Sequence, residues 1–379
     1  MKKIMILLPI AAMALASCSN DEALEKISAA QDNQLQIVPA VQKQTRGTLT
    51  TTANLEFHLE ATGAFKEGTE YESATPKTSL SENLSYTNAW VLSAKTWWAD
   101  ATTTATFKAY APTTLTTSGF SPADAIADQK DVVVAYNEGV RGDFTSGVPL
   151  TFRHVLSQVI VQAVNKTPSD VTISVKAVKL VNINSKNDLT LPTASTAADF
   201  SWSTYTPWAS APTTPKSYRA DQTIELIGTA KDIVGSPMLL LPQQLANVEL
   251  TDGGANYASG NCIAVLIKVT GAADAKIYPT TYAVTTASSE GYAWAYVPVN
   301  TKWEPGKKYI YTLNYAKDAY GLVGPSADQT ADGTPDPTKE SAEDTPQEPG
   351  EPVVEGDPVE LTFNVTVADW EEVTENKNL

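Results

Sequence analysis

"VELTFNVTV", residues 359–367, alternates strictly between apolar and polar residues. Its apolar positions are Val359, Leu361, Phe363, Val365 and Val367. A period of two residues is typical of a β-strand with one buried face, because successive side chains of a strand point to opposite sides. The stretch therefore predicts a strand that covers a hydrophobic core.

The same alternation recurs along the chain. In "YIYTLNY", residues 309–315, every second residue is again apolar or aromatic. "VTISVKAVKLV", residues 171–181, changes phase at Ala177, which predicts a β-bulge there. No convincing amphipathic helix follows the first 17 residues. Many short strands with Gly- and Pro-rich turns indicate an all-β fold built from antiparallel sandwiches.

The length of the chain predicts more than one domain. Residues 47–379, about 330 of the 379, are too many for one ordinary core. We place a boundary near "NKTPSD", residues 165–170. This gives an N-terminal β-sandwich over residues 47–168 and a C-terminal β-sandwich over residues 169–379.

The N-terminus has the pattern of a bacterial lipoprotein signal. Two lysines precede an apolar run from Ile4 to Ala16, which is too short to span a bilayer. Small residues then precede Cys18, so residues 1–17 are predicted to be a signal peptide and Cys18 the lipidated residue. Its acyl chains would anchor the protein to the outer membrane. The alternative is an ordinary secretory signal with a chance cysteine.

The residues after Cys18 bear on where the anchored protein faces. "SNDE", residues 19–22, is an acidic patch. It resembles the surface-export signal of Bacteroidetes lipoproteins. The expected location is therefore the outer face of the outer membrane.

Composition narrows the classes of partner. Acidic residues outnumber basic ones 43 to 27, and the net charge is −16. This balance argues against nucleic acid and against an anionic bilayer surface as partners. With Cys18 lipidated, only Cys262 remains, so no intramolecular disulfide is expected. Cys262 lies in an apolar run and is predicted to pack as a small hydrophobic residue.

Residues 324–358 form a long acidic insertion between two strands. They contain ten acidic residues, seven prolines and one lysine, so they are predicted to be an extended loop. Asp328, Asp332 and Gly333 match three positions of a calcium-binding loop, but a lysine stands where its bidentate glutamate should be. A solvated run of charge is the favoured interpretation.

Catalytic and metal-binding patterns are weak. The two histidines, His58 and His154, lie far apart in the sequence, and no HExxH, CxxC, P-loop or GxSxG motif is present. No pair of carboxylates stands out by its spacing. His154, in "FRHVLSQ", is predicted to be a hydrogen-bonded core or edge residue. We therefore expect neither an enzyme nor a protein with a metal or cofactor.

Several stretches, in this order, resemble one family. They are "NAWVLSAKTWWAD", "ATFKAYAP", "VPLTFRHVLSQVIVQAVNK", "MLLLPQQL", "VPVNTKWEPGKKYIYTLNY" and "FNVTVADWEEV". Together, behind the lipoprotein signal, they resemble the Mfa-like branch of the fimbrillin family, the type V pilus subunits of Bacteroidetes. The resemblance runs from about residue 47 to the end. It implies two tandem transthyretin-like β-sandwiches and a role as a structural subunit of an adhesive surface fimbria.

The resemblance also implies a processing site. Members of this family are cut after an arginine in the region of "AVQKQTRGTLT", residues 40–50, which makes Arg46 the expected site and Lys43 a weaker one. Residues 18–46 would then be a lipidated tether, with "LQIVPAV", residues 35–41, as its protecting strand. Removing a strand leaves a groove that a strand of another pilin subunit can fill. The alternative is a plain lipoprotein tether with an incidental arginine.

The C-terminus departs from the family pattern. Shaft-forming members end in an extra donor strand, whereas only nine residues follow Trp370 here. Either residues 359–367 swing out, with the acidic loop as a hinge, or the subunit accepts a strand without donating one, as a tip or accessory subunit would. The family's polymers can be of one or several kinds of subunit.

A second function remains open, that of a non-polymerising surface lipoprotein that binds a glycan or a host protein. A glycan-stacking platform would need exposed aromatic residues. The aromatic residues of the N-terminal region are instead predicted to be core and inter-strand contacts: Trp90, Trp97, Trp98, Phe107 and Tyr110. Trp370 is likewise expected to pack at the end of the last strand.

Overall fold

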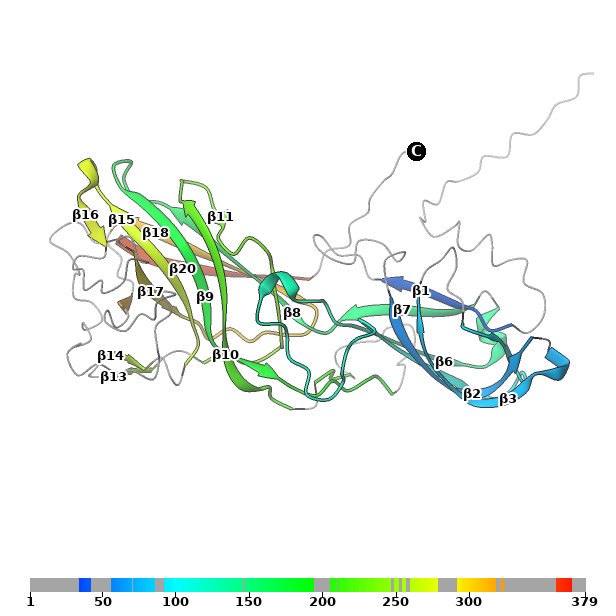
Figure 1. Cartoon of the computed structure of the whole chain (residues 1–379). Coiled ribbons are helices and arrows are strands. Elements are labelled where there is room, and N and C mark those ends of the chain that lie inside the picture. Colours follow the sequence, from blue (N-terminus) through cyan, green and yellow to red (C-terminus); the bar gives the residue numbers. More distant parts are fainter. Residues whose placement is uncertain are drawn as a thin grey trace, which may run out of the picture.

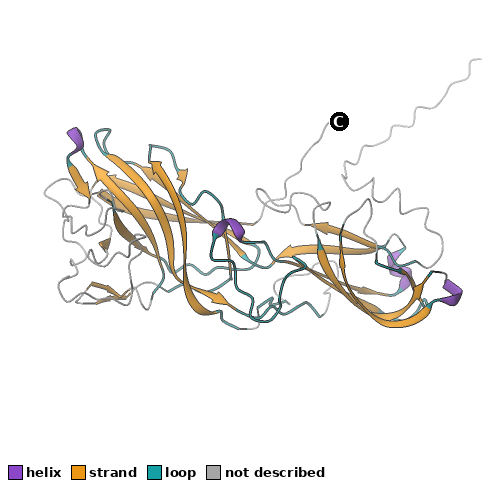
Figure 2. Cartoon of the chain, in the orientation of Figure 1, coloured by secondary structure: helices purple, strands orange, loops and turns teal. Residues whose placement is uncertain are grey.

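The computed structural model describes residues 34–41, 56–69, 71–85, 92–145, 147–193, 205–208, 210–246, 249–251, 254–256, 260–278, 292–317, 322–323 and 359–369. Figures 1 and 2 show that strands dominate these residues. The only helical elements among them are short 3₁₀ turns, at Tyr71–Ser73, Ile126–Asp128, Arg141–Phe144 and Ala272–Asp274. Within this part of the chain, no helix could cross a membrane. The predicted all-β class is confirmed.

The first sheet gathers the N-terminal strands in the order β1-β7-β6-β5-β2-β3, with β4 paired to β2. Its strands are β1 (Ile37–Val41), β2 (Phe57–Gly68), β3 (Thr75–Leu84), β4 (Lys95–Trp98), β5 (Ala105–Ala111), β6 (Val133–Gly139) and β7 (Val148–His154). All its pairs are antiparallel except β1 with β7. β1 forms where the sequence predicts an isolated strand.

The later strands form two further sheets, in the orders β10-β9-β15-β17-β19 and β11-β8-β18-β20, and the small β13–β14 hairpin. β16 joins β15, and β12 joins β8. Their bounds are β8 (Ser157–Asn165), β9 (Thr172–Lys186), β10 (Thr213–Glu225), β11 (Lys231–Asp232), β12 (Met238–Leu240), β13 (Glu249–Thr251), β14 (Gly254–Asn256), β15 (Cys262–Thr270), β16 (Lys276–Tyr278), β17 (Ala293–Pro298), β18 (Lys307–Lys317), β19 (Leu322–Val323) and β20 (Val359–Asp369).

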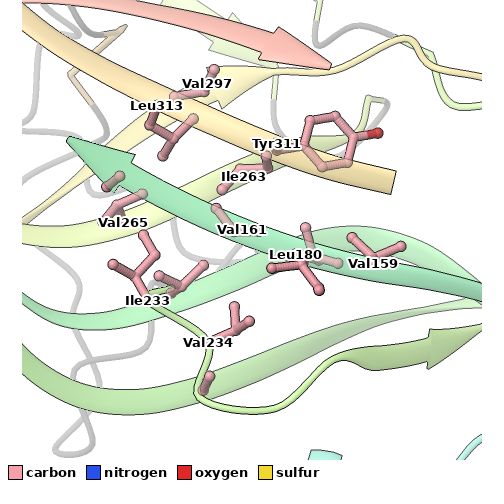
Figure 3. Packing of buried hydrophobic residues seen from close by; sticks show 14 of the residues in the cluster. Val159, Val161, Leu180, Ile233, Val234, Ile263, Val265, Val297, Tyr311 and Leu313 are labelled. Carbon is pink, nitrogen blue, oxygen red and sulfur yellow. The ribbon is translucent and has the colours of Figure 1, made fainter. Parts of the chain in front are cut away.

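Facing sides of these two sheets enclose the largest core. Figure 3 shows Val161 of β8, Val265 of β15 and Leu313 of β18 meeting there, and all three are fully buried. β9 contributes to the same core on both sides of the predicted bulge. Its pairing with β10 and with β15 skips one residue beside Ala177, which confirms the bulge. Cys262 is buried on the other face of β15, as expected, and burial raises the pKa of its thiol to about 12.

A third cluster lies where the chain passes from β7 to β8, through Val155 and Leu156. The indole Nε1 of Trp208 donates to the carbonyl oxygen of Val155 at 2.8 Å. The backbone N–H of Leu239 donates to Oε1 of Gln129 at 2.7 Å. These bonds join segments that are far apart in the sequence, so the passage between the first sheet and the later ones is packed and not a free linker.

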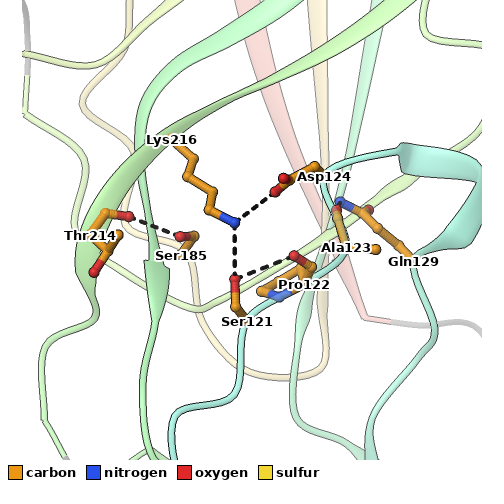
Figure 4. Close-up of polar contacts among 8 residues, drawn as sticks. All are labelled: Ser121, Pro122, Ala123, Asp124, Gln129, Ser185, Thr214 and Lys216. Atoms are coloured by element: carbon orange, nitrogen blue, oxygen red, sulfur yellow. Dashed lines mark hydrogen bonds and ion pairs between the residues drawn. The ribbon is translucent and has the colours of Figure 1, made fainter.

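An exposed polar cluster adds to this junction. Figure 4 shows Lys216 of β10 reaching the 121–129 segment, where its Nζ lies 2.6 Å from Oδ1 of Asp124 and 3.5 Å from Oγ of Ser121. Beside it, Oγ of Ser185 donates to the carbonyl oxygen of Thr214 at 2.8 Å. Because the Asp124 side chain is largely exposed, this ion pair contributes at most about 1 kcal/mol.

Gly63 marks a tight contact inside the first sheet. It lies at the register shift between β2 and β3, and a Cβ added there would stand 2.6 Å from Cβ of Ala105. We expect Gly63→Ala to lower the free energy of unfolding by about 1–3 kcal/mol, because buried β5 must shift to admit the methyl group. Gly142→Ala is the matched control, since its Cβ would meet nothing within 4 Å. Equal urea midpoints for the two variants would contradict the prediction.

Buried tyrosines predict a loss of stability in alkali. Burial raises the pKa of Tyr218 to about 12, and that of Tyr309 to about 12 as well. Unfolded tyrosine ionises at about pH 10, so above that pH the unfolded chain loses protons that the folded chain keeps. Their contribution is therefore complete below about pH 10 and lost as the pH rises through 12. Urea midpoints at pH 8, 10 and 11 should fall only over the upper interval; a flat series would contradict this.

Candidate functional site

The candidate site is the segment of residues 34–41, here called the closing segment. Its β1 portion pairs in parallel with β7, from Ile37 opposite Val148 to Val41 opposite Phe152. Just before β1, the carbonyl oxygen of Gln36 accepts a hydrogen bond from the N–H of Val148 at 2.8 Å. The segment therefore covers one free edge of the first sheet.

The same segment also covers a second edge. The N–H of Leu35 donates to the carbonyl oxygen of Thr96 in β4 at 2.7 Å, and Gln34 forms an antiparallel bridge with Trp97. Since β4 pairs with β2, the order β2, β4, closing segment, β7, β6, β5 returns to β2. The closing segment thus completes a ring of strands, and unpaired backbone groups would line both neighbouring edges without it.

Two side chains of the closing segment enter the core of the first sheet. The side chains of Leu35 and Ile37 are each 4% exposed, whereas the side chain of Gln34 is exposed to solvent. They join the fully buried apolar residues of β7, namely Val148, Leu150 and Phe152. Burying a side chain of this size is worth about 1.5–3 kcal/mol, so the segment is held by its side chains as well as by its backbone.

The aromatic residues line this core. The ring of Trp98 lies 5.8 Å from those of Phe65 and Phe107, and 5.9 Å from that of Phe144. Trp97, Trp98 and Phe107 are all buried, which confirms the predicted packing role. Tyr110 is half-buried and packs against the junction cluster and the ring of His58. Trp90 and Trp370 lie outside the described residues.

β7 depends on the closing segment for most of its length. β6 pairs with β7 only at Arg153 and His154. Nearer the start of β7, the contact from β6 is the amide Nδ2 of Asn137, which donates to the carbonyl oxygen of Pro149 at 2.6 Å. Residues 148–152 therefore have β1 as their only ladder partner among the described strands. Losing the closing segment would leave this half of β7 without a ladder.

Each strand of the β1–β7 pair contains one proline, and the nitrogen of each proline lies on the side of its strand that points away from the other strand. Because the N–H of Val148 points to β1, and bonding alternates along a parallel ladder, Leu150 and Phe152 also direct their N–H groups to β1. Pro149 then lies on the β6 side, and the nitrogen of Pro39 lies on the outer side of β1. Neither proline removes a bond between β1 and β7. Pro39 instead removes a donor from the outer edge of the sheet.

A buried hydrogen-bonded pair, Asp131 and His154, stands at the end of β7. Nδ1 of His154 contacts Oδ2 of Asp131, and both side chains are buried. The predicted role of His154 as a hydrogen-bonded core residue is confirmed. Its partner was missed, because the contact joins residues 23 positions apart and no local pattern marks Asp131. His58 is elsewhere, with its ring nitrogens 2.7 Å from Oδ1 of Asn83 and 3.1 Å from Oγ of Ser81.

Other predicted site residues lie beyond the described part of the chain. These are the lipidation residue Cys18, the processing residue Arg46 with its weaker alternative Lys43, and the calcium-like positions of the acidic loop. In the part that the structure describes, no group of three or more His, Cys, Asp or Glu residues could hold a metal ion. The candidate site is one of strand pairing, formed by the closing segment with β4 and β7.

Comparison with known proteins gives one family match. The family model described as fimbrillin-like matches residues 45–330. A fimbrial protein from Bacteroides vulgatus has a similar crystal structure, with 13% identity, a TM-score of 0.49, and coverage of 90% of this chain and 100% of that chain. A candidate cell adhesion protein from Parabacteroides distasonis matches with 13% identity, a TM-score of 0.41, and coverage of 91% and 100%. No curated protein matches.

Proposed function

This chain belongs to the fimbrillin-like family, whose model matches residues 45–330, and we propose that it is a structural subunit of an adhesive cell-surface fimbria. It assembles by donor-strand exchange with other pilin subunits after proteolysis removes its lipidated N-terminal segment. Before processing it is anchored to the outer membrane through Cys18, once residues 1–17 have been removed. The proposal requires no enzymatic step by this chain and no cofactor.

The closing segment is the observation that supports this proposal. It comes from the part of the chain that precedes Arg46, and it fills a place between β4 and β7 that any extended strand with two apolar residues could fill. A strand from another subunit would regain both the backbone bonds and the buried volume of Leu35 and Ile37. The precursor is then protected from assembly because it occupies its own groove.

Cleavage after Arg46 does not by itself open the groove. The closing segment ends at Val41, so a cut five residues later leaves all its contacts in place. The cleaved N-terminal peptide stays bound until it dissociates or a second strand displaces it. The rate of exchange is therefore set by the hydrogen bonds to Thr96 and Val148 and by the burial of its two apolar side chains.

β20 bears on whether the subunit also donates a strand. It pairs with β18 along its whole length, without a register shift. The residues opposite it include Tyr309, Tyr311 and Tyr315, which are almost completely buried. Swinging β20 out would expose this row to water. We therefore propose that β20 stays in its own sheet and that the subunit accepts a strand without donating one, as a tip or accessory subunit does.

We further propose that the two sandwiches are transthyretin-like and that they meet nearer residue 155 than residue 168. β8 precedes the boundary expected from the sequence, yet it pairs with β11, β12 and β18 of the later sheets. The preceding strand, β7, pairs only within the first sheet. A boundary between His154 and Ser157 keeps every strand with its partners.

Limited trypsin treatment tests the proposal. The chain from residue 19 onward is digested, its new N-terminus is sequenced, and its size and SDS resistance are measured with and without a second subunit. We expect cleavage after Arg46, loss of the released peptide and capture of a partner strand. Arg46→Gln and Lys43→Gln are the matched variants, and only the first should abolish processing. A cleaved chain that never takes up a strand would overturn the proposal and favour a surface lipoprotein that binds a glycan or a host protein.

A further inference from the structure

Among the strands that the structure describes, four of five or more residues stand at sheet edges, and three of these carry features that hinder a further strand from pairing. β1 carries Pro39. β3 carries Pro76 and Lys77 and has a register shift against β2. β10 carries Pro215 and Lys216 and has two register shifts against β9. Prolines, lysines and bulges at an edge are how proteins prevent a further strand from pairing.

β20 is the fourth edge strand, and it has no proline, lysine or bulge of this kind. Its 11 residues include no proline, lysine or arginine, and its register with β18 is unbroken. On its other side, no described strand pairs with it. A long edge strand without such residues presents unpaired N–H and C=O groups to which another strand can bind.

One hydrogen bond reveals which groups of β20 face outward. The N–H of Lys166 donates to the carbonyl oxygen of Tyr315 at 2.6 Å, so the odd-numbered residues of β18 direct their backbone groups to β8. The even-numbered residues of β18 then bond to β20. Since β18 and β20 pair odd with odd and even with even, the odd-numbered residues of β20 direct N–H and C=O groups to the free edge.

The sequence of β20 is complementary to itself in the antiparallel direction. When the whole strand pairs with a second copy, Asn364 stands opposite itself, Phe363 opposite Val365, and Leu361 opposite Val367. Thr362 stands opposite Thr366 in the same register. Apolar pairs and threonine pairs are favourable across strands, and the two acidic residues of β20 each meet an uncharged residue. Within β20, a two-fold axis through Asn364 therefore sets no like charges directly opposite one another.

We infer that β20 is an interface through which two copies of this chain join edge to edge into one continuous sheet. The contact is isologous, since the same strand serves both copies. It requires β20 to remain paired with β18, and it requires no cleavage at Arg46. Its failure and the failure of the proposed assembly are therefore distinguishable, because strand uptake at the closing segment follows proteolysis and this dimer does not.

A pair of cysteine variants tests the register. Asn364→Cys places the two thiols opposite one another at a pair without hydrogen bonds, where Cα atoms are about 4.5 Å apart and a disulfide can form. Glu360→Cys places the same residue on the same strand, but its copies would lie eight residues out of register, about 27 Å apart. In the uncleaved chain from residue 19, mild oxidation should link Asn364→Cys into dimers and leave Glu360→Cys monomeric. Equal linking of the two variants would overturn the inference.

Two proline variants test the free edge. Val365→Pro removes an outward N–H, while Thr366→Pro removes one that bonds to β18. Val365→Pro should raise the dimer dissociation constant at least about tenfold in sedimentation equilibrium, because the two-fold axis removes the bond twice. It should change the melting temperature less than Thr366→Pro does. A wild-type chain that stays monomeric at every concentration, or a dimer that Val365→Pro leaves unchanged, would overturn the inference whatever the folding of Thr366→Pro.

Discussion

Replacing Leu35 and Ile37 together by alanine should lower the free energy of unfolding of the first sheet by about 4 kcal/mol or more. Each change removes a buried aliphatic side chain from the core, and such truncations cost about 2–5 kcal/mol apiece. The backbone bonds to Thr96 and Val148 remain, so the variant weakens the hold of the closing segment without deleting it. Urea unfolding, followed by the fluorescence of Trp98 in the same core, measures the loss.

The control for this double variant lies in the same segment. Gln34→Ala changes an exposed side chain and keeps the bridge to Trp97, so its effect should stay within about 0.5 kcal/mol. Hydrogen exchange adds a local readout, because the N–H groups of Val148, Leu150 and Phe152 depend on β1. These amides should exchange faster in the double variant than in the wild-type chain, and at the wild-type rate in Gln34→Ala. Protection that is equal in both variants would mean that the closing segment does not hold β7.

The same substitutions should speed the exchange of strands. After cleavage following Arg46, the wild-type peptide is held by its contacts alone, and the double variant has lost most of the apolar ones. We expect the nicked double variant to release its peptide faster during gel filtration. If instead both release it at the same rate, the side chains of the closing segment do not control exchange, and the backbone ladder to β7 does.

Local patterns predicted the elements of this fold better than their partners. The alternation in residues 309–315 and 359–367 is found in β18 and β20, and the phase change at Ala177 is found as a bulge. These features depend on residues a few positions apart. The isolated apolar stretch at residues 35–41 likewise forms β1. Each of these predictions needed only residues that are close together in the sequence.

Pairings between distant segments could not be predicted in the same way. β1 and β8 each join a strand far away in the sequence, and both pairs are parallel, whereas the sequence suggested antiparallel sandwiches throughout. Parallel pairs need long connections, so no turn signal marks them. The contact of Leu35 with Thr96 and that of Asp131 with His154 are also decided by the assembled sheet. The closing segment was predicted as a strand, but its place between two edges was not.

The buried pair of Asp131 and His154 gives the second large effect. We expect Asp131→Leu alone to cost about 3–5 kcal/mol, because it leaves the Nδ1 atom of a buried histidine without its carboxylate. His154→Phe alone should cost a similar amount, since it leaves the buried carboxylate of Asp131 without the histidine that contacts it. The pair stands where β7 ends, and the next residue, Val155, bonds to Val132 and receives the indole of Trp208. Either single change should therefore loosen the junction between the first sheet and the later ones.

The double variant, Asp131→Leu with His154→Phe, separates two quantities. One is the net contribution of the pair to the free energy of unfolding, and the other is the cost of removing only one partner. Two apolar side chains of similar volume remove both members of the pair together, so the double change should cost less than either single one. The coupling energy from the four proteins should exceed about 2 kcal/mol, measured by urea unfolding with Trp208 fluorescence as the local signal. Additive costs would mean that the two side chains act independently. In that case the junction would be held by its apolar cluster and by the Trp208 hydrogen bond, and the contact between Asp131 and His154 would have no structural role.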